Sequence, residues 1–279
     1  MQIGVSLPIR ELKNDLVAIR DFAQAAEGLG LTHLRIPEQI IRPSTGHLHE
    51  PMTFLAYMAA FTETIELVPS VIILPARQTG LFAKQAAELD VLTDGRFRLG
   101  IGVGGSREEY QAQGIDFHTR GRRCSEQMVL LKKLWTEPEV SFNGEFHQLE
   151  GVGIDPLPSR AIPIWIGGRG LPGRPVIRRI GRLSDGWFVL CSPEEFPEVR
   201  DSIYAEAAAV GRDQAELGME AGVAVVGPRQ SEWKQRVIGW HQLGLTHLCL
   251  RTLGGELKAT EHLPTLERAV AELPDEVRQ

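Results

Sequence analysis

The sequence has few cysteines and no long apolar run, and each of these absences excludes a class of protein. Its three cysteines, Cys124, Cys191 and Cys249, lie far apart and form no CxxC pair, so they indicate neither a disulfide framework nor a zinc site. No run approaches the roughly 18 apolar residues of a membrane span, and no charged and apolar leader precedes Ile3. We therefore expect a cytoplasmic protein with no membrane association.

The chain also lacks a strong positive charge. The formal net charge is -6, the pI is near 5.8, and no long block of basic residues occurs. This balance argues against a nucleic-acid partner and against an anionic membrane surface. With 279 residues and 43% apolar content, the chain can bury a large core. The partner that this composition favours is a small-molecule substrate.

Short apolar runs alternate with segments of helical periodicity along the chain. The runs that predict strands cover residues 3–7, 33–36, 66–74, 97–103, 164–168, 186–190, 222–226 and 247–251. The segments that predict helices cover about residues 16–29, 51–61, 81–92, 121–135, 175–183, 193–210, 231–243 and 264–273. Eight such pairs predict an α/β fold, a single (β/α)8 TIM barrel domain over residues 1–279, rather than an open doubly wound sheet.

Residues 138–163 interrupt this alternation between the fourth and the fifth strand. Turn signals occur there at Asn143-Gly144, Gly151, Gly153, Pro156 and Pro158. We interpret the segment as an insertion that contains one hairpin.

Glycines follow the fourth strand, at the end where a (β/α)8 barrel places its binding site. Gly102, Gly104 and Gly105 allow the backbone to approach a ligand closely and to adopt left-handed conformations. Gly100, Gly102 and Gly105 also match GxGxxG, the dinucleotide fingerprint. That reading needs an acidic residue at the end of the next strand, and the corresponding position falls inside a predicted helix. We therefore favour a glycine-lined barrel mouth.

A second glycine cluster, Gly167-Gly168-Arg169, follows the fifth strand. Its backbone N–H groups and its guanidinium suit a phosphate or a carboxylate. The alternative is an ordinary strand-to-helix turn with a solvated arginine, and we favour anion binding because the cluster lies at a strand end. Arg251, at the end of the eighth strand, is a weaker candidate for the same role.

The acid-base candidates follow the second strand. Glu38 and Gln39 end that strand, and His47 and His49 lie in the loop after it. A carboxylate and imidazoles near a barrel mouth can move protons, although loop histidines are more often solvated surface residues. The spacing of His47, His49 and Glu50 matches no zinc pattern, so we expect no metal. The absence of GxSxG argues against a serine hydrolase.

Six motifs in order resemble those of the luciferase-like monooxygenase superfamily, and more closely its branch of coenzyme F420 (deazaflavin) dependent oxidoreductases. They are LPARQTGLFAKQAAELDVLTDGRFRLGIGVGG, the spacing of Glu109, Gly114 and RGRR, LLKKLWTEPEVSFNGEFHQL, PLP, PIWIGG and SDGWF. The match runs from about Ile3 to Trp187 and is dense from Pro51 onward. The last part of the chain carries little specific signal.

The resemblance implies a barrel whose insertion forms part of the active-site wall or lid. It implies a flavin-type cofactor at the carboxyl ends of the strands, with the protein positioning the ring and excluding water. It also implies a non-prolyl cis peptide bond between Ser70 and Val71, behind the cofactor ring. Relatives of this type are commonly dimers, so the resemblance admits a homodimer.

The same resemblance assigns roles to the glycines. Gly102 and Gly104 are expected to line the ring or its side chain, and we place Gly105 in the same cofactor-binding set. Gly167, Gly168 and Arg169 are expected to face the phosphate-bearing tail, in agreement with the anion site inferred from their residue types.

The chain departs from its relatives at two acid-base positions. Glu38-Gln39 stands where many members carry Asp-His or Glu-His, and glutamine cannot accept a proton at neutral pH. Gly105 stands where the sugar-phosphate dehydrogenases of the family place a glutamate. Both departures argue against a hexose-phosphate dehydrogenase, and Glu38, His47 or His49 would have to substitute.

Three functional hypotheses follow. The first is an enzyme that binds F420 and transfers a hydride between the deazaflavin and a small organic substrate. The second is an FMN-dependent monooxygenase of the same barrel; the basic residues that often hold the FMN phosphate are absent from the mouth of the fourth strand, where Val103 and Gly105 stand. The third, permitted by Gln39, is a barrel that binds a cofactor and has lost catalysis.

Overall fold

The computed structural model describes residues 1–41, 47–168 and 170–277 of the chain. Its main sheet contains β1 Gln2–Ser6, β2 His33–Ile36, β3 Glu66–Pro69, β4 Ile72–Ile73, β5 Leu99–Gly102, β8 Ile164–Ile166, β9 Gly186–Val189, β10 Gly218–Ala224 and β11 His247–Arg251. All their pairings are parallel, in the order β3-β2-β1-β11-β10-β9-β8-β5-β4.

The sheet closes on itself because β3 and β4 are two parts of one barrel strand. Ser70 and Val71 separate the two parts, β4 pairs with β5, and Leu67 of β3 also bridges Phe97 just before β5. The predicted (β/α)8 barrel is therefore confirmed.

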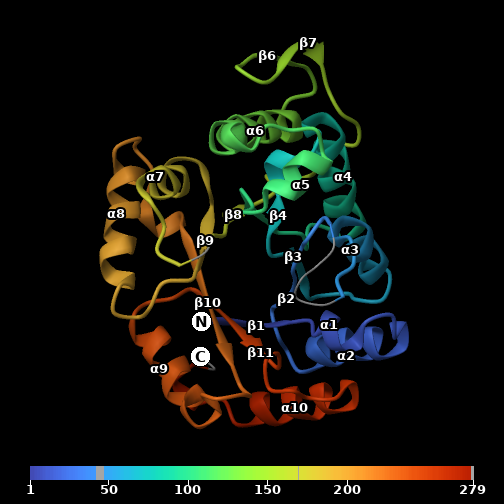
Figure 1. Cartoon of the computed structure of the whole chain (residues 1–279), viewed down its shortest axis with the longest axis vertical. Helices are drawn as coiled ribbons and strands as arrows, with labels where there is room; N and C mark the ends of the chain where they lie inside the picture. Colours follow the sequence, from blue (N-terminus) through green and yellow to red (C-terminus); the bar gives the residue numbers. More distant parts are fainter. Residues whose placement is uncertain (42–46, 169, 278–279) are drawn as a thin grey trace.

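Helices follow the strands and surround the barrel (Figure 1). They are α1 Ile9–Leu12, α2 Leu16–Gly28, α3 Pro51–Ala59, α4 Thr79–Leu92, α5 Arg107–Ala112, α6 Arg120–Thr136, α7 Arg174–Leu183, α8 Phe196–Ala208, α9 Trp233–Gln242 and α10 His262–Ala271. Within the described ranges, none of the helices combines the length and the apolarity that crossing a membrane requires.

Helix α2 shows how the sequence produces this packing. The Asp15 carboxylate accepts a hydrogen bond from the Ala18 N–H and so caps the first turn. Ile19, Phe22 and Ala26 recur at helical spacing and are buried against the barrel. The apolar stripe that predicted this helix is therefore its contact surface.

The insertion contains the predicted hairpin. Strands β6 Val140–Asn143 and β7 Gln148–Val152 pair antiparallel and project beyond α6 (Figure 1). The Glu126 carboxylate on α6 accepts hydrogen bonds from the N–H groups of Glu145 and Phe146 at 2.7 and 2.9 Å. These bonds attach the hairpin to α6.

Three details differ from the sequence-based expectation. The third strand is not continuous over residues 66–74, because the peptide bond between Ser70 and Val71 is cis and interrupts the pairing there, as the family resemblance implied. Strand β10 begins four residues before the expected 222 and ends two residues before the expected 226. The short helices α1 and α5 were not expected.

The barrel interior contains a buried ion network centred on Glu220 of β10. The Glu220 carboxylate accepts hydrogen bonds from Arg35 at 2.7 Å and from Arg98 at 3.1 Å, and the His33 Nε2 atom lies 3.3 Å away. Burial alone would raise the pKa of Glu220, but Arg35, His33 and Arg98 outweigh it and hold the pKa well below its ordinary value. The interior is thus built around an ionised carboxylate.

Glycines on neighbouring strands make room for the large polar side chains of this interior. A Cβ at Gly4 would lie 2.4 Å from the His33 ring, and one at Gly218 would lie 2.0 Å from the Trp165 ring. Trp165 in turn lies under the Arg98 guanidinium, 4.2 Å from the ring centroid. Side chains from several strands therefore fill the barrel interior.

We expect Glu220→Gln to lower the free energy of unfolding by about 3–5 kcal/mol at neutral pH, because Arg35 is then left buried without a carboxylate partner. The folded-state pKa of Glu220 lies below the unfolded value of about 4.3. Its stabilisation is therefore complete above the unfolded pKa and is lost as the pH falls through the folded pKa. Urea unfolding of wild type and variant should converge as the pH falls below about 4.

The matched control is Glu232→Gln, which removes an ion pair with Arg229 between half-exposed side chains. Such a pair contributes at most about 1 kcal/mol. Equal destabilisation by the two variants, or a Glu220→Gln effect that does not change with pH, would contradict the ionised network.

Candidate active site at the barrel mouth

The cis peptide bond follows β3, and it meets two of the predicted glycines at the carboxyl ends of β5 and β8. A Cβ at Gly102 would lie 2.8 Å from Val71 Cγ2, and a Cβ at Gly167 would lie 2.6 Å from Val71 Cγ1. The Gly167 N–H also donates to the Ile101 carbonyl at 2.7 Å. The structure thus brings Val71, Gly102 and Gly167 together, and only glycine leaves space for Val71 between the two strand ends.

The remaining glycines differ in their surroundings. Gly104 has a φ of +62°, and a Cβ there would lie 2.9 Å from Ile73 Cγ2. Gly105 and Gly168 are exposed, and a Cβ at either would meet no atom within 4 Å. Their backbone is therefore open to a ligand, which fits a cofactor held by N–H groups. Arg169 lies outside the described residues.

Arg35 connects the cis peptide bond to the interior ion network. Its guanidinium donates to the Ser70 Oγ atom and to the Glu220 carboxylate, and it lies 4.4 Å from the Phe188 ring centroid. Arg35 was not among the predicted site residues. The signal was present, since Arg35 is the one basic residue in the short strand His33–Ile36, and a charge inside a buried strand requires a partner.

Glu38 is held in place by its neighbours. Its carboxylate accepts hydrogen bonds from the Arg77 guanidinium and the Ile73 N–H, and its side chain is 2% exposed. Burial raises the pKa of Glu38, and Arg77 opposes that rise. Arg77 also pairs with Glu50 at 2.9 Å, so the carboxylate of Glu38 is oriented by the helix and loop that follow β4.

The other acid-base candidates lie in the loop after β2. The Nε2 atoms of His47 and His49 are 3.4 Å apart, and the His49 ring stacks on Phe54 with centroids 4.5 Å apart. Gln39 is partly buried. The structure connects this loop to Glu38 through Arg77 and Glu50. Catalytic roles for Glu38, Gln39 and His47 stay predictions.

The unexpected helix α5 fixes the loop between β5 and α6. The Tyr110 hydroxyl donates to the Val103 carbonyl at 2.6 Å, and the Glu109 carboxylate accepts from the Ile40 N–H at 2.9 Å. Ser106 caps the helix by accepting from the Glu109 N–H. The loops that follow β2 and β5 are therefore joined at the mouth.

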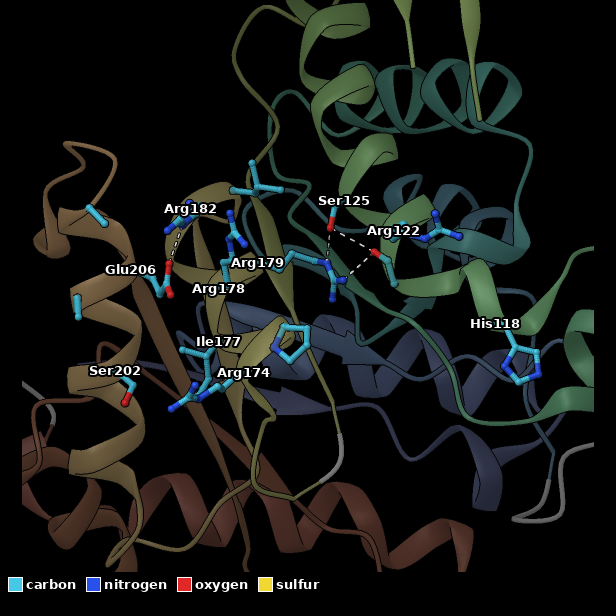
Figure 2. Close-up of a pocket in the computed structure, with 15 residues that line it drawn as sticks. His118, Arg122, Ser125, Arg174, Ile177, Arg178, Arg179, Arg182, Ser202 and Glu206 are labelled. Atoms are coloured by element: carbon cyan, nitrogen blue, oxygen red, sulfur yellow. Dashed lines mark hydrogen bonds and ion pairs between the residues drawn. The ribbon is translucent and has the colours of Figure 1, made fainter. Parts of the chain in front are cut away.

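A groove of about 1080 Å³ lies between α6, α7 and α8, and we call it the arginine groove. It extends from Arg174 at the first turn of α7 to Leu183 at its last residue. Figure 2 shows Arg174, Arg178 and Arg182 along α7 and Arg122 on α6. Since α7 follows the Gly167-Gly168 turn, the groove begins beside the barrel mouth.

Not every arginine of the groove is available to a ligand. Arg179 donates to Ser125 Oγ and to the Gly121 carbonyl, and Arg182 pairs with Glu206 at 2.6 Å. Arg174 and Arg178 are exposed, and no ion pair holds either of them within the described parts of the chain. The fold and the site thus define a barrel protein with an open glycine mouth and an adjoining cationic groove.

Comparison with known families identifies the class. The family described as luciferase-like monooxygenase matches residues 1–269. The chain therefore belongs to the luciferase-like monooxygenase family, as its motifs predicted.

Two relatives show how far the similarity extends. An F420-dependent glucose-6-phosphate dehydrogenase of Kineococcus radiotolerans is 31% identical over 92% of this chain and 76% of its own length. An uncharacterized protein of Mycobacterium bovis is 30% identical over 63% of this chain. The match covers 66% of the length of the mycobacterial protein.

Two solved structures share the fold over nearly the whole chain. A monooxygenase from Streptomyces bottropensis has a TM-score of 0.81 at 19% identity, with 98% of both chains covered. An F420-dependent secondary alcohol dehydrogenase in complex with an F420-acetone adduct has a TM-score of 0.79 at 14% identity, with 98% of this chain and 99% of the other covered. At these identities the likeness shows the fold alone.

We expect Gly167→Ala to destabilise the protein by about 1–3 kcal/mol, because its Cβ would overlap Val71 Cγ1 at the strand ends. Gly168→Ala is the matched control, since the adjacent position is open. Chemical unfolding measures both variants, and a Gly168→Ala effect as large as that of Gly167→Ala would refute the packing described for Val71.

Proposed function

We propose that this chain is an F420-dependent oxidoreductase that transfers a hydride between F420 and a small organic substrate. The observation that carries the proposal is the arginine groove beside the Gly167-Gly168 turn. The relative from Kineococcus radiotolerans, which is F420-dependent, supports the same cofactor. When bound, F420 supplies a ring carbon that donates or accepts the hydride.

The groove favours F420 over FMN on grounds of charge. The FMN side chain ends at a single phosphate, whereas the F420 side chain continues from its phosphate to further carboxylates. The exposed guanidinium groups of Arg174 and Arg178 suit such an extended anion. A groove along the whole of α7 is longer than one phosphate requires.

We assign the residues of the chain to three tasks. Ser70, Val71, Gly102, Gly104 and Gly105 hold the ring. Gly167, Gly168 and Arg169 bind the phosphate, and Arg174 and Arg178 bind the charges beyond it.

The third task is proton exchange with the substrate, which accompanies hydride transfer. Gln39 has no proton-accepting group at neutral pH, so Glu38, His47 and His49 are the candidates. The Arg77 contact fixes the orientation of Glu38, and burial keeps its carboxyl away from bulk water.

The FMN-dependent monooxygenase is the second candidate function. The family whose model matches the chain is described as luciferase-like monooxygenase, and the monooxygenase from Streptomyces bottropensis shares the fold. A barrel that binds cofactor without catalysis is the third, and Gln39 is the residue that permits it.

Cofactor titration tests the proposal directly. We expect F420 to bind at least about tenfold more tightly than FMN, because the arginine groove adds charge-assisted contacts that only F420 can use. Fluorescence of each cofactor measures binding to the purified chain. Tight FMN binding without F420 binding would establish the monooxygenase alternative, and binding of neither would overturn both.

The double variant Arg174→Gln/Arg178→Gln tests the groove itself. A hydrogen bond to a charged group contributes about 1.5–3 kcal/mol, so we expect the loss of both guanidinium groups to weaken F420 binding at least about 100-fold and FMN binding to change little. Arg20→Gln is the control, because Arg20 lies on α2 in an exposed pair with Asp21. Equal loss of F420 and FMN affinity would place both tails in the groove and remove the argument for F420.

A further inference from the structure

A second cavity, of about 380 Å³, opens at the carboxyl ends of β1, β2, β10 and β11, and we call it the mouth pocket. Ser70 lines it, so it adjoins the cis peptide bond where the cofactor ring is proposed to lie. Its volume is at the lower end of the range for small-molecule sites, about 300–1,000 Å³. The pocket therefore suits a small ligand next to the cofactor.

The mouth pocket is cationic. Arg10, Arg35 and Arg251 line it, and none of its described lining residues is acidic. Arg35 is paired with Glu220 at the inner end of the pocket. Arg10 and Arg251 take part in no ion pair with the described carboxylates, so no carboxylate occupies the binding positions of these two guanidinium groups.

Arg251 projects into the barrel rather than into solvent. Its guanidinium crosses Gly222 of β10, where a Cβ would lie 2.1 Å from Arg251 Nη2. Only glycine at position 222 therefore leaves room for the Arg251 guanidinium. Burial lowers the pKa of Arg251, and the neighbouring Arg35 acts in the same direction. A cation placed in this way is stabilised by an anion that enters the pocket.

The guanidinium groups of Arg10 and Arg35 also lack some of the hydrogen bonds that buried polar atoms normally make. Their Nε atoms are buried and have no acceptor among the described residues. Leu7 and Ile9 supply the apolar part of the lining.

We infer that the mouth pocket binds a small organic anion, a carboxylate or a phosphate ester, through Arg10, Arg35 and Arg251. The inference rests on the proposed function, because it treats this anion as the substrate that meets the cofactor at Ser70. The inference specifies the class of substrate for the proposed hydride transfer. Apolar contacts with Leu7 and Ile9 favour a substrate with a short hydrocarbon chain.

Calorimetric titration of the full chain without cofactor tests this inference. The probes are inorganic phosphate, glutarate and its uncharged analogue glutaramide. We expect at least one of the two anions to bind at least about tenfold more tightly than glutaramide. Phosphate binding without glutarate binding assigns a phosphate ester, and the reverse assigns a carboxylate. Equal binding of glutarate and glutaramide, or no saturable anion binding at millimolar concentration, overturns the inference.

Variants locate the binding. We expect Arg251→Gln to weaken the anion at least about tenfold, and Arg10→Gln provides a second variant if Arg251→Gln does not fold. Arg229→Gln is the matched control, because Arg229 lines a neighbouring cavity that Arg251 also borders. Loss of the anion in Arg229→Gln but not in Arg251→Gln would overturn the assignment.

The proposed F420 binding and the inferred anion binding can be contradicted independently of each other. The variant Arg174→Gln/Arg178→Gln should weaken F420 and leave the small anion unchanged, whereas Arg251→Gln should do the reverse. Anion binding that disappears with Arg174 and Arg178 lies in the arginine groove and overturns the mouth-pocket assignment. Failure of F420 to bind, with anion binding intact, overturns the proposed cofactor and leaves an anion site without its role as a substrate site.

Discussion

The ionised carboxylate of Glu220 is the constraint on which the barrel interior depends. A charge buried in a protein is costly unless it is paired and hydrogen-bonded, and Glu220 meets this condition with Arg35, Arg98 and His33, which come from other parts of the barrel wall. These partners are large, so the neighbouring strands carry glycine where the side chains cross, as at Gly4. Charge pairing and glycine placement are thus two parts of one packing solution.

The same network reaches the site. Arg35 bonds Glu220 with one nitrogen and Ser70 with another, so the strand end that carries the cis peptide bond is held from inside the barrel. Above this point lie Val71 and the two glycines that make room for it, Gly102 and Gly167. A rigid support of this kind suits a cofactor enzyme, in which the protein positions the ring and shapes the electrostatic environment.

Two cationic cavities adjoin this support from different sides. The arginine groove runs along the outside of α7, and the mouth pocket opens over the barrel interior beside Ser70. Although the chain has a net charge of -6, several arginines line each of these two cavities, and clefts lined by one sign of charge attract ligands of the other. The proposed function would assign an anionic cofactor tail to one cavity and an anionic substrate to the other.

Much of the fold could be predicted because it depends on local patterns in the sequence. Alternating apolar runs and helical stripes predicted all eight barrel strands and the helices between them, and Asn143-Gly144 predicted the turn of the hairpin. Helix α5 escaped because it is six residues long, which is too short for a periodicity to show. Of the site, the glycines were predictable from strand ends, and a charged side chain in the short strand His33–Ile36 signalled that Arg35 needs a partner. The identity of that partner and the place of Arg10 beside Arg251 were not predictable, because contacts between distant segments leave no local pattern.

The sequence by itself determined the barrel, its insertion, the family and the glycine positions at the strand ends, since these depend on spacing along the chain. Only the tertiary structure decided which charges meet. Glu220 and Arg35 are 185 positions apart, and closure of the barrel is what places them in contact. Closure likewise brings Arg10 and Arg251, from opposite ends of the chain, to one pocket, because β1 and β11 are neighbours in the sheet.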